Sequence, residues 1–224
     1  MVSADEEFRE LIRGTAHIDL VLGCGLIAEA AGHHRVREIV ADQFESLAMT
    51  VEGSDVVGVV RSLRDDLGFD GDRQNYDNPA NSMLHLVVER RRGLPILLAV
   101  VVGEVCRRRG ISTQIIGMPG HVLVSDGAEV PTFVDAFHSA HPLSRGGARG
   151  LYESMTGLSN FEDRFLDPID PRAVLWRILN NLLSRYRRTG DLAGMRWVMK
   201  LRVAFPEAEA EAEREFARLM GPLN

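Results

Sequence analysis

The sequence predicts an α+β fold in which N-terminal helices precede a central helix packed on a small antiparallel sheet, and a helical tail follows. Three observations support this prediction. Apolar residues recur at helical spacing through much of residues 1–67, the period changes to two after Gly110, and helical spacing returns after residue 170. We place the core with its N-terminal helices at residues 1–168 and the tail, which we expect to pack on it, at residues 169–224.

The composition is that of a globular chain. It has 224 residues, of which 45% are hydrophobic and 26% charged, and its mean hydropathy is −0.06, which suits a buried core and excludes wholesale disorder. The net charge of −6 argues against nucleic acid or an anionic membrane as a partner. The longest apolar run, residues 95–102, is too short to cross a bilayer. No secretory signal is visible and two cysteines cannot form a disulfide framework, so we expect a cytoplasmic protein.

The first half of the chain is predicted to be helical. Residues 18–31 are apolar but contain Gly23 and Gly25, and two interpretations stay open. Either one helix passes through both glycines, or a turn at Gly23 ends one segment and a new helix starts near Cys24. Residues 36–49 and 56–67 also have helical spacing.

A loop, two helices and a sheet are predicted next. The turn formers of residues 69–79 indicate a surface loop, and Asn81-Ser82 is expected to cap a helix over residues 83–91. Gly93-Leu94-Pro95 opens a very apolar helix that Gly110 closes. Short β-branched segments then predict an antiparallel sheet of at least three strands, at residues 112–118, 121–125 and 132–137. The glycine-rich residues 143–150 are predicted to be a mobile connection.

The tail is predicted to contain paired helices. Residues 171–186 carry an apolar stripe, Gly190-Asp191 interrupts it, and a second helix ends at Phe205-Pro206. The basic residues 185–202 and the acidic residues 207–215 are expected to attract one another. The pattern resembles one and a half tetratricopeptide units, which rarely stand alone, and the tail is also the expected surface for a protein partner.

Six short motifs occur in order along the chain: Leu67-Gly68-Phe69, Asn75-Tyr76, Asn78-Pro79-Ala80-Asn81-Ser82, Glu89-Arg90-Arg91-Arg92-Gly93-Leu94-Pro95, Pro119-Gly120-His121-Val122-Leu123-Val124 and Phe133-Val134-Asp135. With the order of elements, they resemble the transglutaminase-like superfamily, which includes papain-type cysteine chemistry. More narrowly, they resemble its SirB-like branch, which couples this core to a C-terminal tetratricopeptide-like tail. The resemblance covers about residues 18–205.

The resemblance implies a Cys-His-Asp triad, in which the His and Asp would be His121 and Asp135. A carboxylate bonded to one imidazole nitrogen fixes the tautomer and leaves the other nitrogen as a base. The alternative for His121 is a buried histidine satisfied by the backbone. The family's nucleophile would fall at or near Pro95, where this chain has no thiol.

Cys24 is the candidate for a relocated nucleophile. If it opens a helix after a turn at Gly23, unpaired N–H groups and the helix dipole would stabilise its thiolate. The alternative is a small residue packed between helices. Cys106 is expected to be a core thiol.

Two further histidines, His138 and His141, follow Asp135 closely and are expected to line the same mouth as substrate-binding residues. A zinc site formed by these two and an acid is conceivable, but the segment lacks ligand-rich spacing. We therefore expect no metal and no cofactor.

The leading functional hypothesis is a cysteine-dependent acyl-transfer or acyl-cyclisation enzyme, with Cys24 as nucleophile, His121 as base and Asp135 as the residue that orients it. Its substrate would be a thioester or amide, either a small molecule or an acyl group on a carrier protein. The resemblance adds secondary metabolism as a setting, because transglutaminase-like acyl transferases and cyclases occur there. Two alternatives stay open: a catalytically inactive regulator or protein-interaction module, and a thiol-independent acid–base catalyst that uses His121 and Asp135 alone.

Overall fold

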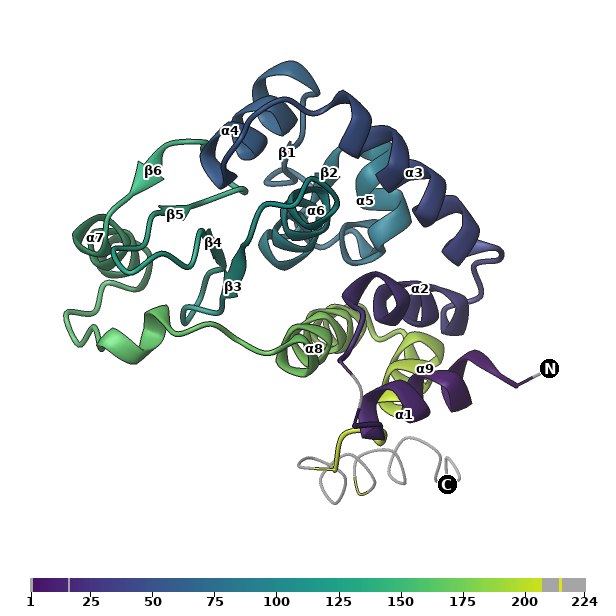
Figure 1. Cartoon of the computed structure of the whole chain (residues 1–224). Coiled ribbons are helices and arrows are strands. Elements are labelled where there is room, and N and C mark those ends of the chain that lie inside the picture. Colours follow the sequence, from purple (N-terminus) through teal and green to yellow (C-terminus); the bar gives the residue numbers. More distant parts are fainter. Residues whose placement is uncertain (1, 16, 207–213, 215–224) are drawn as a thin grey trace.

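The structure is a computed structural model that describes residues 2–15, 17–206 and 214. Its first half is helical, as predicted (Figure 1). The helices there are α1 (Ala4–Arg13), α2 (Leu20–Ala30), α3 (Val36–Thr50) and α4 (Val56–Arg61), the last continuing into a π-helical turn at Ser62–Asp66.

Helix α2 passes through both of its glycines, so the first of the two interpretations is correct. Asp19 begins the helix, because its Oδ1 accepts the N–H groups of Val21 and Leu22 at 2.8 and 3.0 Å. At Gly23 the missing side chain leaves room for Leu175 of the tail, whose Cδ1 would lie 2.6 Å from a Cβ there.

The central helices are α5 (Leu84–Arg90) and α6 (Pro95–Arg108), preceded by a 3-10 turn at Pro79–Ser82. The predicted cap on α5 is wrong. The residue before α5 is Met83, and Asn81 is buried in the preceding turn, where it donates to Asn75 O at 2.8 Å and accepts from Arg90 at 3.0 Å. The predicted loop also contributes a short strand, β1 (Asp70–Gly71), which pairs in parallel with β2 (Arg92–Gly93).

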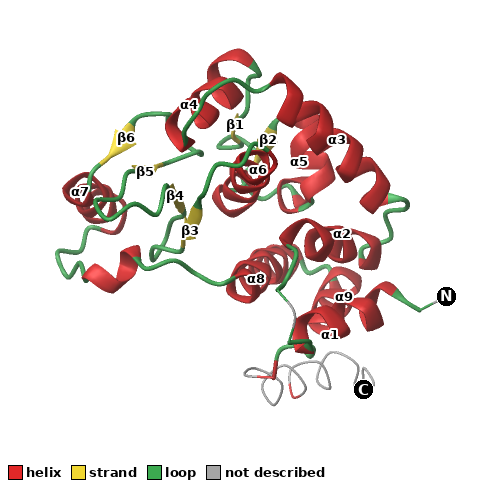
Figure 2. Ribbon diagram, in the orientation of Figure 1, coloured by secondary structure: helices red, strands yellow, loops and turns green. Residues whose placement is uncertain are grey.

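The main sheet has four short antiparallel strands in the order β3-β4-β5-β6 (Figure 2). They are β3 (Gln114–Ile116), β4 (Leu123–Ser125), β5 (Phe133–Val134) and β6 (Pro142–Leu143). Val124 and Val134 belong to the main core, which includes α6, whereas Leu123 and Phe133 belong to a smaller cluster. Side chains of successive strand residues therefore alternate between two buried layers.

Residues 143–150 are not the predicted mobile connection, because most of them belong to α7 (Arg145–Thr156). The Ser144 side chain caps this helix by accepting from Gly147 N at 3.2 Å. Ala148 and Tyr152 are buried, and Ala148 lies in the smaller cluster with Leu123 and Phe133. Packing therefore stabilises a helix that its glycines disfavour.

The tail contains α8 (Pro171–Thr189) and α9 (Leu192–Arg202), and a 3-10 turn at Asp163–Leu166 precedes them. Helix α8 packs on α9, α2 and α6, and α9 contacts α1 (Figure 1). The acidic residues 207–215 lie, apart from residue 214, outside the described part of the chain, so their expected attraction to the basic segment stays a prediction. The boundary at residue 168 also stays a prediction. Among the helices that the structure describes, none is both long and apolar enough to cross a membrane.

Candidate functional site

The pairing of two strands brings His121 and Asp135 together. His121 comes before β4 and Asp135 follows β5, and Val124 lies opposite Val134 in the antiparallel register. The start of one strand therefore meets the end of the other. A turn holds His121 in place, because its N–H donates to Met118 O at 3.0 Å.

The two side chains form a buried contact. His121 Nε2 lies 2.8 Å from Asp135 Oδ2, and the side chains are 2% and 4% exposed. The contact is short but bent, since Nε2 does not meet the angle of a good hydrogen bond. Within the described residues, no hydrogen bond engages the other ring nitrogen, Nδ1. The expected proximity of His121 and Asp135 is thus confirmed, and their catalytic roles stay predictions.

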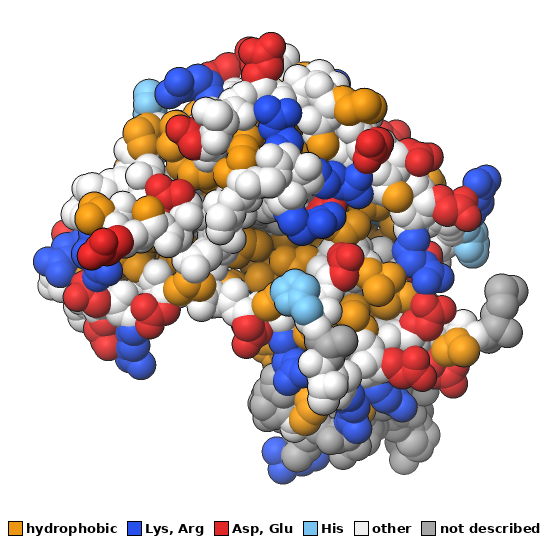
Figure 3. Space-filling view, in the orientation of Figure 1, with side chains coloured by type: hydrophobic (Ala, Val, Ile, Leu, Met, Phe, Trp, Pro, Cys, Tyr) orange, Lys and Arg blue, Asp and Glu red, His pale blue; other side chains and the backbone are white. Residues whose placement is uncertain are grey.

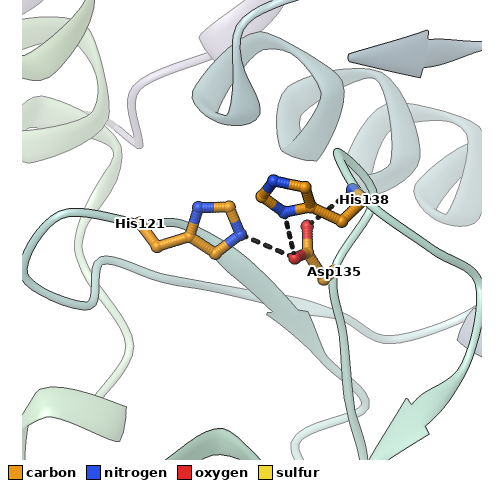
Figure 4. A group of neighbouring side chains, drawn as sticks. All are labelled: His121, Asp135 and His138. Carbon is orange, nitrogen blue, oxygen red and sulfur yellow. Dashed lines mark hydrogen bonds and ion pairs between the residues drawn. The ribbon is translucent and has the colours of Figure 1, made fainter. Parts of the chain in front are cut away.

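His138 is a third member of this cluster (Figure 4). Its Nδ1 lies 2.7 Å from the same Asp135 oxygen, and its ring centroid is 5.1 Å from that of His121. Asp135 Oδ1 accepts the backbone N–H groups of Phe137 and His138 at 2.9 and 3.1 Å. The sequence predicted that His138 lines the site, but not that it shares the carboxylate. The spacing of three residues after an Asp at a strand end, typical of an Asx turn, is the signal that indicates it.

The cluster favours the ionised form of the Asp135 carboxyl group. Burial raises the pKa of the Asp135 carboxyl, but contacts with His121 and then with His138 outweigh this and hold the pKa below its usual value. In neutral imidazoles the nitrogens that face the carboxylate carry the protons. Nδ1 of His121 and Nε2 of His138 are then proton acceptors.

Two arginines support the loop that carries this cluster, and no motif in the sequence indicated them. Arg64, on the π-helical turn after α4, donates to Ala136 O at 2.8 Å, to His138 O at 3.2 Å and to Asp70 at 2.8 Å. Arg73 donates to Phe137 O at 3.4 Å. The turn after β5 is therefore fixed by side chains from a distant part of the sequence.

The same three side chains are also the candidate ligands for a metal. His121, Asp135 and His138 each offer one ligand atom, and these atoms lie within 4.8 Å of one another. Of the two histidines in the conceivable zinc set, His138 belongs to this group and His141 does not. His141 is exposed, and its backbone N–H bonds to Ser139 Oγ at 3.4 Å.

Cys24 lies inside a helix and does not open one, so it lacks the surroundings that an activated thiol needs. It lies inside α2, where the ladder of backbone bonds has already begun with Gly23 N to Asp19 O at 3.0 Å. Burial, and then the negative charge of Asp19, raise the pKa of its thiol to about 12. Its helix packs mainly on α1, α3, α5 and α8, not on the strands that flank His121 and Asp135. Cys106 is also fully buried, as expected of a core thiol.

The start of α6 is the place where the resemblance puts the nucleophile, and it has none. Pro95 is the first residue of the helix and Leu94 precedes it, without a side-chain cap. Ile96 and Leu97 are buried in the core. Residues 94–97 at the start of this helix therefore offer apolar side chains and no hydroxyl or thiol.

Comparisons with known proteins find similar chains in bacteria and in the mouse. The chain is 39% identical over 142 residues to a UPF0162 protein of Xylella fastidiosa, covering 60% of this chain and 50% of the relative. It is 27% identical over 166 residues to a UPF0162 protein of Pseudomonas aeruginosa, covering 70% and 57%. Mouse F-box only protein 21 is 27% identical over 198 residues, which is 84% of this chain but 30% of that protein.

The chain thus spans about half the length of the Xylella relative that it matches. No solved structure matches it. The family model described as the transglutaminase-like superfamily matches residues 32–180, a span that contains the central helices, the sheet and the His121–Asp135 pair. The chain belongs to the transglutaminase-like superfamily.

Proposed function

We propose that this protein is a thiol-independent acid–base catalyst that hydrolyses an acyl ester, thioester or amide. The observation that supports the proposal most directly is the buried contact of 2.8 Å between His121 and Asp135, with Nδ1 of His121 unbonded within the described residues. A carboxylate beside one imidazole nitrogen, with the other nitrogen left to accept a proton, is the arrangement that general bases use.

The reaction starts when Nδ1 of His121 takes a proton from water. The water oxygen forms a bond to the acyl carbon, and the carbonyl oxygen becomes an oxyanion. When this intermediate collapses, the bond to the leaving group breaks and the imidazolium returns its proton to that group. Asp135 stabilises the imidazolium. His138, whose side chain is 40% exposed, offers a second imidazole through which a proton reaches solvent. His141 is proposed to contact substrate at the mouth.

A base-activated water fits the site better than Cys24 does. A buried thiol with a pKa of about 12 is almost entirely protonated at neutral pH, and the thiol is a far weaker nucleophile than the thiolate. The proposed substrate remains an acyl group on a small molecule or a carrier protein. Acyl transfer or cyclisation would follow if an amine or a carbanion replaced water as the attacking group.

A catalytically inactive regulator is the second candidate. It is favoured by the 2% exposure of the His121 side chain and by Pro95 at the expected position of the nucleophile. In that case the cluster is a structural remnant, and a protein partner would bind through the tail.

The test is hydrolysis of p-nitrophenyl acetate and an acetyl thioester by the full chain and its variants. We expect His121→Ala and Asp135→Asn to lower kcat/KM by about 10²–10⁴-fold, since each removes the general base or its orientation. Cys24→Ala and His141→Ala are the controls: the first should leave the rate unchanged, and the second should alter KM alone.

Two other outcomes of the hydrolysis assay would contradict the proposal. A wild-type chain without turnover of either substrate would favour the regulator. Loss of activity in Cys24→Ala, together with an acyl adduct in intact-mass spectra, would favour thiol catalysis. Iodoacetamide gives a further check, because Cys24 and Cys106 are both buried and should react equally slowly in the folded chain.

A further inference from the structure

A groove of about 540 Å³ opens on the face of the molecule shown in Figure 3, where apolar side chains line a hollow between α6 and α8. The segment before α2, helix α6, strand β3 and the start of α8 form its walls. Apolar lining residues include Ile18, Leu20, Val100, Ile111, Ile115 and Val174. None of the three residues of the His/Asp cluster lines it. Its size and apolar walls are those of a small-molecule site.

The wall formed by α6 is open because one of its residues is a glycine. A Cβ built on Gly103 would meet nothing closer than Thr113 Oγ1, at 3.9 Å. Glycine is a poor residue for a helix interior, and here no close packing requires it. Any longer side chain at this position would enter the groove.

The carboxylates of the groove are already compensated by the chain itself. Glu104, 8% exposed, accepts from Arg107 at 2.7 and 2.8 Å and from Arg108 at 2.7 Å. The Asp19 carboxylate accepts hydrogen bonds from the backbone N–H groups at the start of α2. A cationic ligand would therefore find no unpaired carboxylate here. For an anionic ligand, Arg107 of the lining already bonds to both oxygens of Glu104, so either ion would lose hydration without a free partner.

Polar groups with unused bonding capacity lie just before β3, the edge strand of the sheet. Within the described residues, the hydroxyls of Ser112 and Thr113 make no hydrogen bond, and both residues line the groove. The strand edge beyond them is closed, because Ile169 N donates to Ile115 O at 2.9 Å. One end of the groove thus offers hydroxyl groups, and the rest is apolar.

We propose that this groove is a second binding site, and that it takes an uncharged, mostly apolar small molecule with one hydrogen-bonding head group. The apolar part lies against Val100, Ile111 and Val174, over the backbone of Gly103. The head group bonds to the hydroxyls of Ser112 and Thr113. This site is separate from the His121–Asp135 cluster and does not depend on the catalytic proposal.

The test is a fluorescence titration of the full chain with N-phenyl-1-naphthylamine, an uncharged apolar probe with one N–H group. We expect saturable binding at one site. Gly103→Leu should weaken it by at least about tenfold, or about 1.4 kcal/mol, since the new side chain occupies the groove. Gly150→Leu is the matched control, because Gly150 lies on α7 with open space around its Cβ position, and it should bind as the wild type does.

Thr113→Val should weaken binding several-fold by removing a head-group partner, and the sulfonated analogue of the probe should bind more weakly than the uncharged one. Far-UV circular dichroism and the melting temperature of each variant establish that it is folded. Non-saturable binding, equal affinity of Gly103→Leu and wild type, or tighter binding of the sulfonate would each overturn the proposal.

Discussion

At the scale of single residues, His85 shows how burial changes proton affinity away from the candidate site. It is buried on α5, and its Nε2 lies 3.3 Å from Nδ1 of His33. Its own Nδ1 is buried and, among the described residues, has no partner. Burial, and then the positive charge of His33, lower the pKa of His85 from 6.5 to about 4.

The consequence is a loss of stability on mild acidification. Between about pH 6.5 and about pH 4 the unfolded chain binds a proton at His85 that the folded chain does not, so the free energy of unfolding falls as the pH falls. Urea unfolding at pH 7 and pH 5 measures this. His85→Gln should reduce the difference between the two pH values, whereas the control His34→Gln, at an exposed position, should retain it. An unchanged pH dependence in His85→Gln would contradict the assignment.

The sequence predicted the His121–Asp135 pair because the resemblance places these residues on neighbouring strands. It did not predict that His138 shares the carboxylate, because that depends on the turn after β5 and on Arg64, far away in the sequence. The error at Cys24 has a related cause. Flanking glycines are compatible with a helix start or with close helix packing, and only the position of Leu175 distinguishes them.

At the scale of elements, the interior glycines Gly23 of α2 and Gly103 of α6 have opposite structural reasons. In α2, a Cβ at Gly23 would lie 2.6 and 2.9 Å from the two terminal carbons of Leu175, which is fully buried and cannot move away easily. In α6, a Cβ at Gly103 has free space. Close packing requires the first glycine, and the second opens the groove.

Alanine substitutions should therefore have opposite effects on stability. Gly23→Ala is expected to destabilise the chain. Overpacking against Leu175 costs about 1–3 kcal/mol, and the better helix propensity of alanine offsets about 1 kcal/mol of this cost. Gly103→Ala should stabilise it by about 0.5–1 kcal/mol, because only helix propensity changes. Urea denaturation of both variants beside the wild type measures the two signs. Equal signs would show that local helix propensity, not the neighbouring helix, decides both positions.

Elements with a strong local pattern were predicted well, and those decided by packing were not. Helix α6 follows from its apolar run between Pro95 and Gly110, and the sheet follows from the change of period after Gly110. The sequence does not indicate helix α7 because its glycines suggest a loop, whereas Ala148 is buried in a cluster with Leu123 and Phe133 of the sheet. The predicted cap on α5 failed because Asn81 bonds to other loop residues and to Arg90.

At the scale of the whole molecule, the tail and the core share one hydrophobic interior. Leu175, Ile178 and Leu179 of α8 are fully buried in the same cluster as α6 and α2. The family match also continues into α8, ending at residue 180. Packing thus joins the two segments that the predicted boundary at residue 168 would separate.

The tail should therefore unfold together with the core. Both tryptophans of the chain, Trp176 and Trp197, lie in α8 and α9, so intrinsic fluorescence reports on the tail, and far-UV circular dichroism reports on all helices. We expect the two signals to give one coincident urea transition, because α8 cannot detach without exposing the apolar side chains of the shared core to water. Ile178→Ala should shift both curves by the same amount, at a cost of about 2–5 kcal/mol. A fluorescence transition that precedes the loss of the remaining helical signal would instead establish the tail as an independently unfolding unit.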